Sequence, residues 1–413
     1  MTTILFLMDA MRSDYLSKEN TPFLYKCSKE GDYYKRVIPN FGFCERTEIF
    51  TGQTPIQSGF FTAIGLDEKN SSFKNLPELP ILEIIDNNIP KNFKIPFLLK
   101  KGELYHFFRR IINRWIIKRT LGISPQNIPL GLLPYWALTE DKIDHREENA
   151  FDVESIFSLL KQSGKKLYYE SFSALSISFN GSDENRLKMM LNNMKKENVD
   201  LSLVYISAPD LFGHEYGPGS KELNAALFKM DSQLEYYTNE ILKIDENTKF
   251  IFLGDHGMAQ VEKYFDAEKQ ILKIAKSNML NLKKDFIYFL DSTLVRLWFF
   301  SKRAKSIFET ELLGSELFLE NGIFINEKIA MKENIPWNDP RYGDMIWWAN
   351  NGVLVFPDFF HRIKKYKGMH GYNPFLKCNQ GLCVVYGNKN KNKITEEIHL
   401  NEVFKILRES LEI

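Results

Sequence analysis

The sequence predicts an α/β fold in which a mostly parallel central sheet is flanked by helices and carries inserted cap segments. Short apolar runs at Ile4–Met8, Leu203–Ile206 and Phe250–Leu253 show no amphipathic period, which is typical of strands buried on both faces of a sheet. Between about residues 150 and 280, such strands alternate with helical patterns, as in parallel βαβ units. With 413 residues, the chain is long enough for one large core with insertions.

The expected elements follow one another along the chain. After the first strand, a helix is expected to begin at Cys44 or Glu45 and to end at Thr51, where Gly52 supplies the C-terminal stop. The alternating region predicts helices over 155–162, 184–196 and 220–242, and strands over 167–169, 203–206 and 250–253. A strand at Cys383–Tyr386 and a terminal helix return to the core.

Two stretches interrupt this alternation, residues 76–145 and residues 281–368. The first is basic and aromatic, and the second is rich in Trp and Phe. We expect both to be insertions within a single domain spanning 1–413. They are expected to cover or border the edge of the sheet where the strands deliver their functional side chains.

Composition and charge exclude several classes of protein. The net charge of +1 provides no global attraction to nucleic acid, so no nucleic-acid partner is expected. The four cysteines are scattered without a CxxC pair, which argues against a disulfide framework or a zinc knuckle. The sequence shows neither a secretory leader nor about 18 consecutive apolar residues. We therefore expect a cytoplasmic protein with reduced thiols.

Acidic and histidine residues follow each of the three apolar runs. Asp9 comes directly after the first run, Asp210 and His214 follow the second, and Asp255 and His256 follow the third. Because ligands bind beyond the carboxyl ends of the strands in open α/β sheets, we expect these side chains to meet at one edge. Carboxylates and neutral imidazoles suit Zn²⁺ or Mn²⁺. The layout therefore predicts a two-metal hydrolase.

The motifs that contain these residues occur in an order that resembles the alkaline phosphatase superfamily, most closely its type I phosphodiesterase and nucleotide pyrophosphatase branch. The matching motifs are Met8-Asp9-Ala-Met-Arg-Ser-Asp-Tyr15, Phe50-Thr51-Gly52-Gln-Thr-Pro55, Ala208-Pro209-Asp210-Leu-Phe-Gly213-His214, Gly254-Asp255-His256-Gly257-Met258 and Gly368-Met369-His370-Gly371-Tyr372. The resemblance spans nearly the whole chain apart from about 76–145. It implies an alkaline-phosphatase-like catalytic domain.

The resemblance also implies two divalent metal ions, with Zn²⁺ favoured and Mn²⁺ as the alternative. One ion would be held by Asp210, His214 and His370. The second would be held by Asp9, Asp255 and His256. All six positions carry residues that can ligate a metal ion.

The sequence departs from the family at the nucleophile. In the family it lies nine residues before the threonine of the Thr-Gly pair, and counting back from Thr51 gives Gly42, which has no side chain. Three alternatives remain. Cys44 could attack as a thiolate with a depressed pKa, although a small buried hydrophobe is the commonest fate of a free cysteine. Thr47 could serve instead, or a metal-activated water could attack without any covalent nucleophile.

Two further residues of this segment are candidates for roles in the site. We expect Arg46 to contact the phosphoryl group, because a guanidinium binds tetrahedral oxyanions bidentately. The alternative for Arg46 is an ordinary charge on a helix surface. Glu45 stands where the family phosphodiesterases carry an asparagine, and a carboxylate there should not help to bind a phosphate. Glu45 is expected instead to orient Arg46 or to touch a metal ion.

Residues 94–119 form a basic, aromatic segment with eight Lys or Arg and a single acid, Glu103. Apolar residues recur at helical spacing from 107 onward, namely Phe107, Phe108, Ile111, Ile112, Trp115 and Ile116. The pattern predicts an amphipathic basic helix with Trp on its apolar side. Such a helix either lies in an anionic membrane surface, here the inner membrane face, or packs its apolar face on the domain.

The function that these observations favour is two-metal-dependent hydrolysis or transfer of phosphoric esters. A phosphodiesterase acting on a nucleotide-sugar-like or lipid-linked glycan phosphate is the leading hypothesis. A sulfatase is the first alternative, favoured slightly by Cys44 and Arg46, but Cys44 lacks the Pro-Ser-Arg context that would follow it. A non-catalytic metal-binding homologue is the second alternative, although six retained ligands would be costly without a metal.

Overall fold

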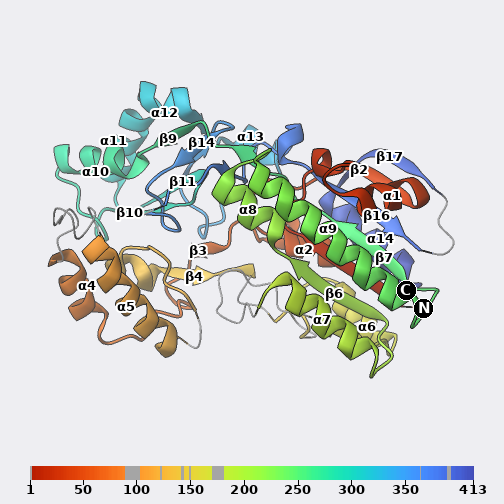
Figure 1. Ribbon diagram of the computed structural model, residues 1–413. Coiled ribbons are helices and arrows are strands. Elements are labelled where there is room, and N and C mark those ends of the chain that lie inside the picture. Colours follow the sequence, from red (N-terminus) through yellow and green to blue (C-terminus); the bar gives the residue numbers. More distant parts are fainter. Residues whose placement is uncertain are drawn as a thin grey trace.

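The central sheet has seven strands, and six of them run in the same direction (Figure 1). In spatial order the strands are β17 (Ile394–His399), β2 (Asp32–Ile38), β16 (Gly381–Tyr386), β7 (Lys249–Leu253), β1 (Thr3–Met8), β6 (Leu201–Ile206) and β5 (Leu167–Tyr169). Only β16 is antiparallel to its neighbours, β2 and β7. The computed structural model describes residues 2–88, 103–120, 123–140, 144–147, 150–169, 181–362, 364–387 and 392–413. The predicted α/β class is confirmed.

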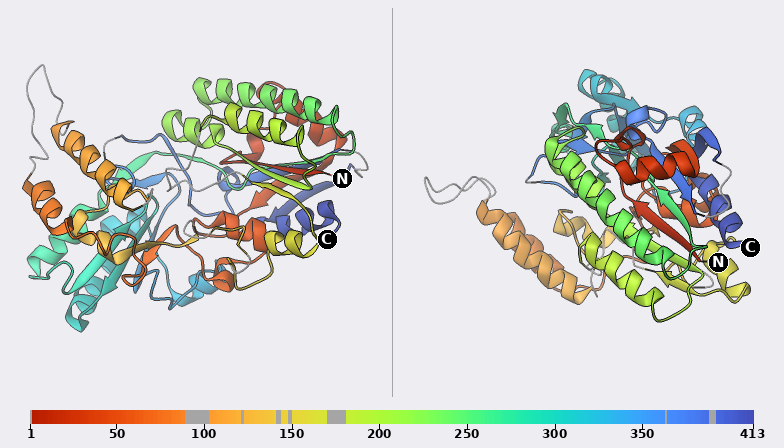
Figure 2. Two further views of the ribbon diagram at one scale, coloured as in Figure 1. Left: turned by 90° about the horizontal axis from the view of Figure 1, so that it is seen from below. Right: turned by 45° about the vertical axis from the view of Figure 1, so that its right-hand side comes forward.

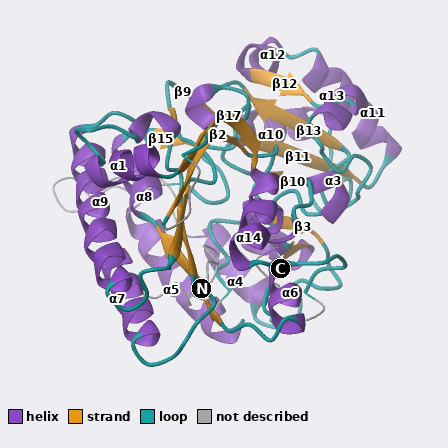
Figure 3. Cartoon of the chain, turned by 90° about the vertical axis from the view of Figure 1, so that its right-hand side faces the viewer, coloured by secondary structure: helices purple, strands orange, loops and turns teal. Residues whose placement is uncertain are grey.

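Helices cover both faces of this sheet (Figures 2 and 3). One face carries α1 (Pro22–Glu30), α7 (Asp183–Met194) and α9 (Lys221–Leu242), and the other carries α2 (Glu45–Thr51), α6 (Ile156–Gln162) and α14 (Val403–Leu411). Every residue of β1 and β6 is buried between these layers. This explains why their sequences are apolar apart from Thr3 and Ser202, instead of alternating between apolar and polar residues.

The expected helix after the first strand and the expected strands are present. The helix α2 ends at Gly52, whose φ of 71° is the left-handed conformation that favours glycine at a helix C-terminus. The side chain of Ser220 caps α9 by accepting a hydrogen bond from the N–H of Leu223 at 3.2 Å. The strand β2 had no counterpart in the sequence-based prediction, because five of its seven residues are only half-buried and the strand has no continuous apolar run.

Residues 281–368 build most of a second, antiparallel sheet. Its strands are β10 (Phe286–Leu290), β11 (Leu294–Phe299), β13 (Met345–Ala349) and β12 (Gly322–Phe324), in that spatial order. The neighbouring helices are α10 (Ala267–Ser277), α11 (Lys302–Leu313), α12 (Glu316–Asn321) and α13 (Glu327–Lys332). This lobe lies beside the central sheet in Figure 1.

Residues 76–145 contain a helical pair, α4 (Leu79–Asn88) and α5 (Glu103–Arg119), followed by a 3₁₀ helix (Leu130–Tyr135). The strand β4 (Trp136–Leu138) then pairs with β3 (Ile64–Leu66). Ile112 and Ile116 of α5 are buried in the same core as the second sheet, so the described parts of segments 76–145 and 281–368 share one core.

The apolar face predicted for the basic helix is only partly buried in the structure. Ile112 and Ile116 are buried and Trp115 is half-buried, but Phe107, Phe108 and Ile111 remain exposed. The part of the basic segment at 94–102 lies outside the described residues. No helix in the described part of the chain combines the length and the apolar character needed to cross a membrane.

Candidate active site

Neighbouring strands of the central sheet place Asp9 and Asp255 at one edge. Leu7 of β1 pairs with Leu253 of β7, so the two chains leave the sheet together at their carboxyl ends. The Asp9 N–H donates to the carbonyl oxygen of Ile206 at 2.9 Å, which extends the ladder by one residue. The N–H groups of Ala10 and His256 donate to Asp255 Oδ1 at 3.2 and 3.0 Å. Backbone hydrogen bonds therefore fix the main chain at Asp9 and the carboxylate of Asp255.

Asp9, Asp255 and His256 form one group of possible metal ligands, with one ligand atom from each within 4.8 Å of the others. His256 Nε2 lies 3.2 Å from Asp9 Oδ1 and 3.9 Å from Asp255 Oδ1. His256 Nδ1 lies 2.9 Å from the carbonyl oxygen of Gly257. Because a carbonyl can only accept, Nδ1 carries the proton and Nε2 faces the carboxylates. The hydroxyl of Tyr205 donates to Asp9 Oδ2.

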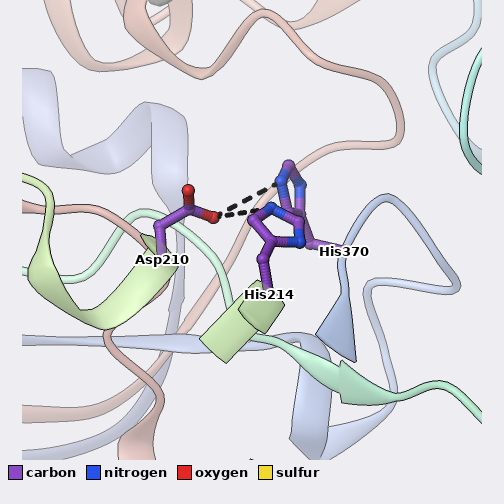
Figure 4. Close-up of side chains that lie close together, drawn as sticks. All are labelled: Asp210, His214 and His370. Carbon is purple, nitrogen blue, oxygen red and sulfur yellow. Dashed lines mark ion pairs between the residues drawn. The ribbon is translucent and has the colours of Figure 1, made fainter. Parts of the chain in front are cut away.

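Asp210, His214 and His370 form a second group with the same spacing (Figure 4). Asp210 and His214 lie one turn apart on α8 (Ala208–Tyr216), with His214 Nε2 3.0 Å from Asp210 Oδ1. His370 follows β15 (Gly368–Met369), and its Nε2 lies 3.7 Å from the same oxygen. His214 Nδ1 donates to the carbonyl oxygen of Gly368 at 2.9 Å, which leaves Nε2 available to a metal ion.

Both groups line one cavity of about 450 Å³. The donor set, three carboxylates and three imidazoles, suits Zn²⁺ or a similar divalent ion. Asp9 Oδ1 and Asp210 Oδ1 are buried, and neither accepts a hydrogen bond from the described residues. A buried carboxylate oxygen without a donor is costly unless a cation compensates it. The residues therefore fit one divalent ion in each group.

The electrostatics of the site point in the same direction. Burial, reinforced by the negative charges of Asp9 and Glu45, raises the pKa of Asp255 to about 7 despite the opposing charge of His256. Burial and the positive charges of His256 and His214 lower the pKa of His370 well below its ordinary value. Burial of these ionisable groups thus shifts their pKa values in opposite directions. A divalent cation would stabilise the ionised carboxylates and the neutral imidazole together.

The segment that contains the expected nucleophile lies partly in the cavity wall and partly outside it. Arg46 and Glu45 line the cavity with the six candidate ligands. Burial raises the pKa of Glu45, although the positive charge of His256 opposes this. Cys44 and Thr47 are not among the described residues that line the cavity.

Neither Cys44 nor Thr47 is a surface residue. Cys44 is buried at the N-terminal end of α2. Thr47 is buried as well, and its hydroxyl donates to Glu140 Oε1 at 2.5 Å while its N–H donates to the same oxygen. The assignment of either side chain as nucleophile stays a prediction.

Gly42, where the motif spacing predicts the nucleophile, has a backbone that excludes a side chain. Its φ is 128°, and a Cβ added there would lie 2.2 Å from the carbonyl oxygen of Phe61. That separation is far below any van der Waals contact, and the obstacle is backbone and not a movable side chain. The absence of a nucleophile at this position is therefore built into the local fold.

Several residues of the cavity wall were not among the site residues predicted from the sequence. They are Phe43, Ala63, Gln126, Tyr205, Asp291, Ser292, Phe360, His361, Tyr366 and Met369. Gln126 comes from the segment 76–145, and Asp291, Ser292, Phe360, His361 and Tyr366 come from 281–368. The short Asp291-Ser292 turn between β10 and β11 carried a signal, because polar residues interrupt two apolar runs there.

Comparisons with known proteins agree with this geometry. A model of the family described as type I phosphodiesterase / nucleotide pyrophosphatase matches residues 134–373, more than half of the chain. The chain belongs to this family of phosphoester hydrolases. The resemblance inferred from the motifs is thereby confirmed, and the match gives no support to the sulfatase alternative.

Individual relatives are more distant. The venom phosphodiesterase CdcPDE of Crotalus durissus collilineatus is 24% identical over 433 residues, covering 99% of this chain and 44% of that protein. The chain thus spans less than half the length of the venom phosphodiesterase. Murine ectonucleotide pyrophosphatase / phosphodiesterase 5, solved as an inactive threonine-to-alanine variant with AMP, has a TM-score of 0.67 and 16% identity, covering 100% of this chain and 95% of that one. The human protein has a TM-score of 0.67 and 17% identity, with the same coverage.

Proposed function

We propose that this chain is a two-metal phosphodiesterase that cleaves phosphoric diesters bearing a glycosyl or nucleotidyl group. The observation that carries the proposal is the pair of Asp/His groups on one cavity, each with a buried carboxylate oxygen that accepts no hydrogen bond from the described residues. The family membership supports ester cleavage at phosphorus. A lipid-linked glycan phosphate belongs to the same substrate class.

The chain's own residues would divide the work as follows. Asp210, His214 and His370 would hold one ion, and the group of Asp9, Asp255 and His256 would hold the other. When bound, two such ions, which we propose to be Zn²⁺, withdraw electron density from the phosphoryl oxygens and stabilise the charge that develops in an in-line displacement. Arg46, on the same cavity, would contact a phosphoryl oxygen through its guanidinium.

Of the three alternatives for the attacking group, direct attack by water has the best geometric support. Gly42 has no side chain and no room for one. The hydroxyl of Thr47 is engaged with Glu140, and neither Thr47 nor Cys44 lines the cavity. A single displacement then replaces the two displacements that a covalent intermediate requires.

Hydrolysis of bis-p-nitrophenyl phosphate, p-nitrophenyl phosphate and p-nitrophenyl sulfate with added Zn²⁺ or Mn²⁺ tests the activity. We expect cleavage of the diester in preference to the monoester and the sulfate, and loss of this activity in Asp255→Ala. Turnover of the sulfate alone, or of no ester by protein that holds two metal ions, would contradict the proposal. A diester chiral at phosphorus tests the attack, because one displacement inverts the configuration whereas two retain it.

We also propose that the helical pair α4–α5 contacts an anionic membrane surface, at the inner membrane face if the chain is cytoplasmic. Six apolar side chains are exposed on the two helices, namely Ile81, Ile84, Ile85, Phe107, Phe108 and Ile111. On α5, the exposed cations Arg110, Arg114 and Lys118 are spaced four residues apart, on the same side of the helix as Phe107 and Ile111. Apolar side chains mixed with cations on one helix face favour the boundary of an anionic bilayer.

Sedimentation with vesicles tests this contact. We expect binding to vesicles of phosphatidylglycerol and phosphatidylcholine and little binding to phosphatidylcholine alone. The double variant Phe107→Ser/Ile111→Ser should reduce binding several-fold, whereas Phe228→Ser, which changes an exposed phenylalanine on α9, should not. Equal binding by both variants would contradict a contact through α5.

A further inference from the structure

One wall of the cavity presents hydrogen-bond acceptors and an aromatic ring on the side of the antiparallel lobe. We infer that this wall, formed by Asp291, Phe360 and His361 and here named the hydroxyl-binding wall, recognises the hydroxyl groups of a glycosyl or ribosyl group esterified to the phosphoryl group. The inference rests on the proposed phosphodiesterase function and names the part of the substrate that this wall selects.

His361 is held in one orientation by two partners behind it. Its Nδ1 lies 3.2 Å from Asp358 Oδ2 and 3.2 Å from the hydroxyl oxygen of Ser292. The Ser292 hydroxyl itself donates to Asp358 Oδ2 at 2.9 Å, so it is free only to accept from His361. Because both partners accept a hydrogen bond from Nδ1, the proton of the neutral ring lies on Nδ1. Nε2 then carries a lone pair and can act as an acceptor.

Asp358 is built into the loop that carries His361. It is fully buried, and its Oδ1 accepts the N–H groups of Phe360, at 2.7 Å, and of His361. The carboxylate therefore fixes the backbone and the imidazole of the same residue. A buried carboxylate with this many donors has a structural role, but its contact with Nδ1 also determines which atom His361 offers to the cavity.

His361 Nε2 has no hydrogen-bond partner among the described residues. His361 lines the cavity, and its side chain is 23% exposed. The ring lies beside Tyr366, with centroids 4.6 Å apart, and Tyr366 in turn lies 5.3 Å from the ring of His214. The free acceptor is thus close to the candidate metal ligands without belonging to them.

Asp291 offers a second acceptor on the same wall. Its Oδ2 accepts from Nε of the fully buried Arg296 at 2.9 Å, which anchors the carboxylate. Arg296 is the only described side chain that donates a hydrogen bond to this carboxylate. Since Arg296 balances the charge of Asp291, the carboxylate can accept from a substrate hydroxyl without demanding a cation.

The aromatic member of the wall is fixed from the first insertion. The side-chain amide of Asn127 donates to the carbonyl oxygen of Phe360 at 2.7 Å, and the N–H of Asn127 donates to that of Phe359 at 2.7 Å. These bonds fix the backbone at Phe359 and Phe360, and Phe360 lines the cavity together with Gln126. An aromatic face next to hydrogen-bonding groups suits the apolar face of a sugar ring.

The chemistry of the wall discriminates between two kinds of substrate group. A phosphate that is ionised offers acceptors only, and it would face the acceptors of Asp291 and His361. A hydroxyl group can donate to both. Among the described residues that line the cavity, Arg46 is the only Lys or Arg. The hydroxyl-binding wall therefore offers no permanently charged cation to a second phosphate. The wall therefore favours a hydroxylated group over a second phosphate or an alkyl chain.

A matched pair of diesters tests this inference. The p-nitrophenyl ester of glucose 6-phosphate and p-nitrophenyl cyclohexylmethyl phosphate share the leaving group and the six-membered ring, and differ in the hydroxyl groups and the ring oxygen. We expect the metal-loaded wild type to prefer the glucose diester in kcat/KM by at least about tenfold. In His361→Leu this preference should fall by about tenfold, mainly through KM, as the loss of a buried hydrogen bond predicts.

Two further variants separate contact from structure. His361→Gln keeps an acceptor of similar reach and should restore part of the preference. Asp358→Asn keeps an acceptor for the backbone N–H groups but weakens the hold on Nδ1, so it should lower the preference in the same direction. An unchanged preference in His361→Leu, or an equal loss on both diesters, would overturn the inference.

The outcomes also separate this inference from the proposed function. If the wild type cleaves bis-p-nitrophenyl phosphate but shows no preference for the glucose diester, the inference fails and the proposed function stands. If it cleaves no diester, the proposed function fails. In that case, calorimetry can measure the binding of glucose 6-phosphate and of cyclohexylmethyl phosphate to the metal-loaded wild type and to His361→Leu. Selective binding of the sugar phosphate that is lost in His361→Leu would support the inference. No selective binding by the wild type would refute it.

Discussion

The imidazole of His256 stacks on that of His370, with ring centroids 4.2 Å apart and planes inclined by 23°. His256 follows a strand of the central sheet, whereas His370 arrives more than a hundred residues later, from a short strand beside α8. The contact joins the two groups of candidate ligands. A substitution in one group should therefore also perturb the side chains of the other.

Replacing Asp255 by asparagine removes a charge from the group that it forms with Asp9 and His256. We expect the metal content, measured by atomic emission, to fall from two ions to one or none. Diester hydrolysis should fall by more than about 100-fold. Loss of a residue that only hydrogen-bonds to a metal ligand typically costs about 10- to 100-fold in activity, and loss of a ligand itself should cost more. Two tightly bound ions in active Asp255→Asn would show that Asp255 is not a ligand.

Replacing Tyr205 by phenylalanine removes the hydroxyl that donates to Asp9 Oδ2. We expect the affinity for the metal ion at that group to fall by about 10- to 100-fold, and excess metal to restore part of the activity. Metal titration of the apoprotein measures this. Tyr288→Phe is the matched control, since it removes a buried hydroxyl that donates to Glu268 at 2.9 Å, outside the cavity wall. Equal affinity in both variants would refute the role of Tyr205.

Removing the side chains of Cys44 and Thr47 separates chemistry from stability. If water attacks directly, kcat/KM should stay within about tenfold of the wild type in Cys44→Ala and in Thr47→Ala. Thr47→Ala should nevertheless lower the free energy of unfolding by about 1–3 kcal/mol, because the buried Glu140 loses a donor. Thr47→Ser, which keeps the hydroxyl, should lose less. Complete loss of activity in folded Cys44→Ala would identify a covalent nucleophile.

Replacing Gly42 by alanine tests the backbone constraint at the family's nucleophile position. We expect a loss of about 2–4 kcal/mol in the free energy of unfolding, which combines the strained φ with the collision against the carbonyl of Phe61. Gly164→Ala is the matched control, because its φ is also positive, at 66°, but nothing lies within 4 Å of the added carbon. That variant should lose only about 1 kcal/mol. Urea unfolding compares the two, and equal losses would refute the collision.

The buried imidazole of His145 should make the stability depend on pH. Burial is the main reason that the pKa of His145 is lowered to about 4 in the folded chain, whereas an unfolded histidine titrates near 6.5. As the pH falls below 6.5, the unfolded state takes up the proton first. The contribution of His145 to stability is therefore complete above pH 6.5 and declines as the pH falls toward 4.

Urea unfolding at pH 7.5 and pH 5.0 measures this effect. We expect the wild type to lose about 2 kcal/mol more than His145→Phe between these two pH values. Phenylalanine removes the titrating group and suits a site that already packs against Phe50, Phe151 and Phe157. Identical pH dependence in the two proteins would show that His145 does not titrate in this way.

Much of the fold and of the candidate site could be predicted from the sequence. The apolar runs identified β1, β6 and β7 because parallel strands are buried on both faces, and their carboxyl ends then had to share one edge. The same rule brought together Asp9, Asp210 and Asp255. The antiparallel lobe was not predicted, because short apolar segments of similar composition do not state which partner they pair with or in which direction.

The sequence by itself determined which residue types stand at the ends of the buried strands, and it determined that Gly42 offers no side chain for attack. Only the tertiary structure decided that Thr47 faces Glu140 instead of the cavity, since the rotation of α2 is set by its packing against other elements. It also decided that Ser292 and Asp358 orient His361. A sequence period records which face of an element is apolar, but the contacts between distant faces arise only when the layers pack.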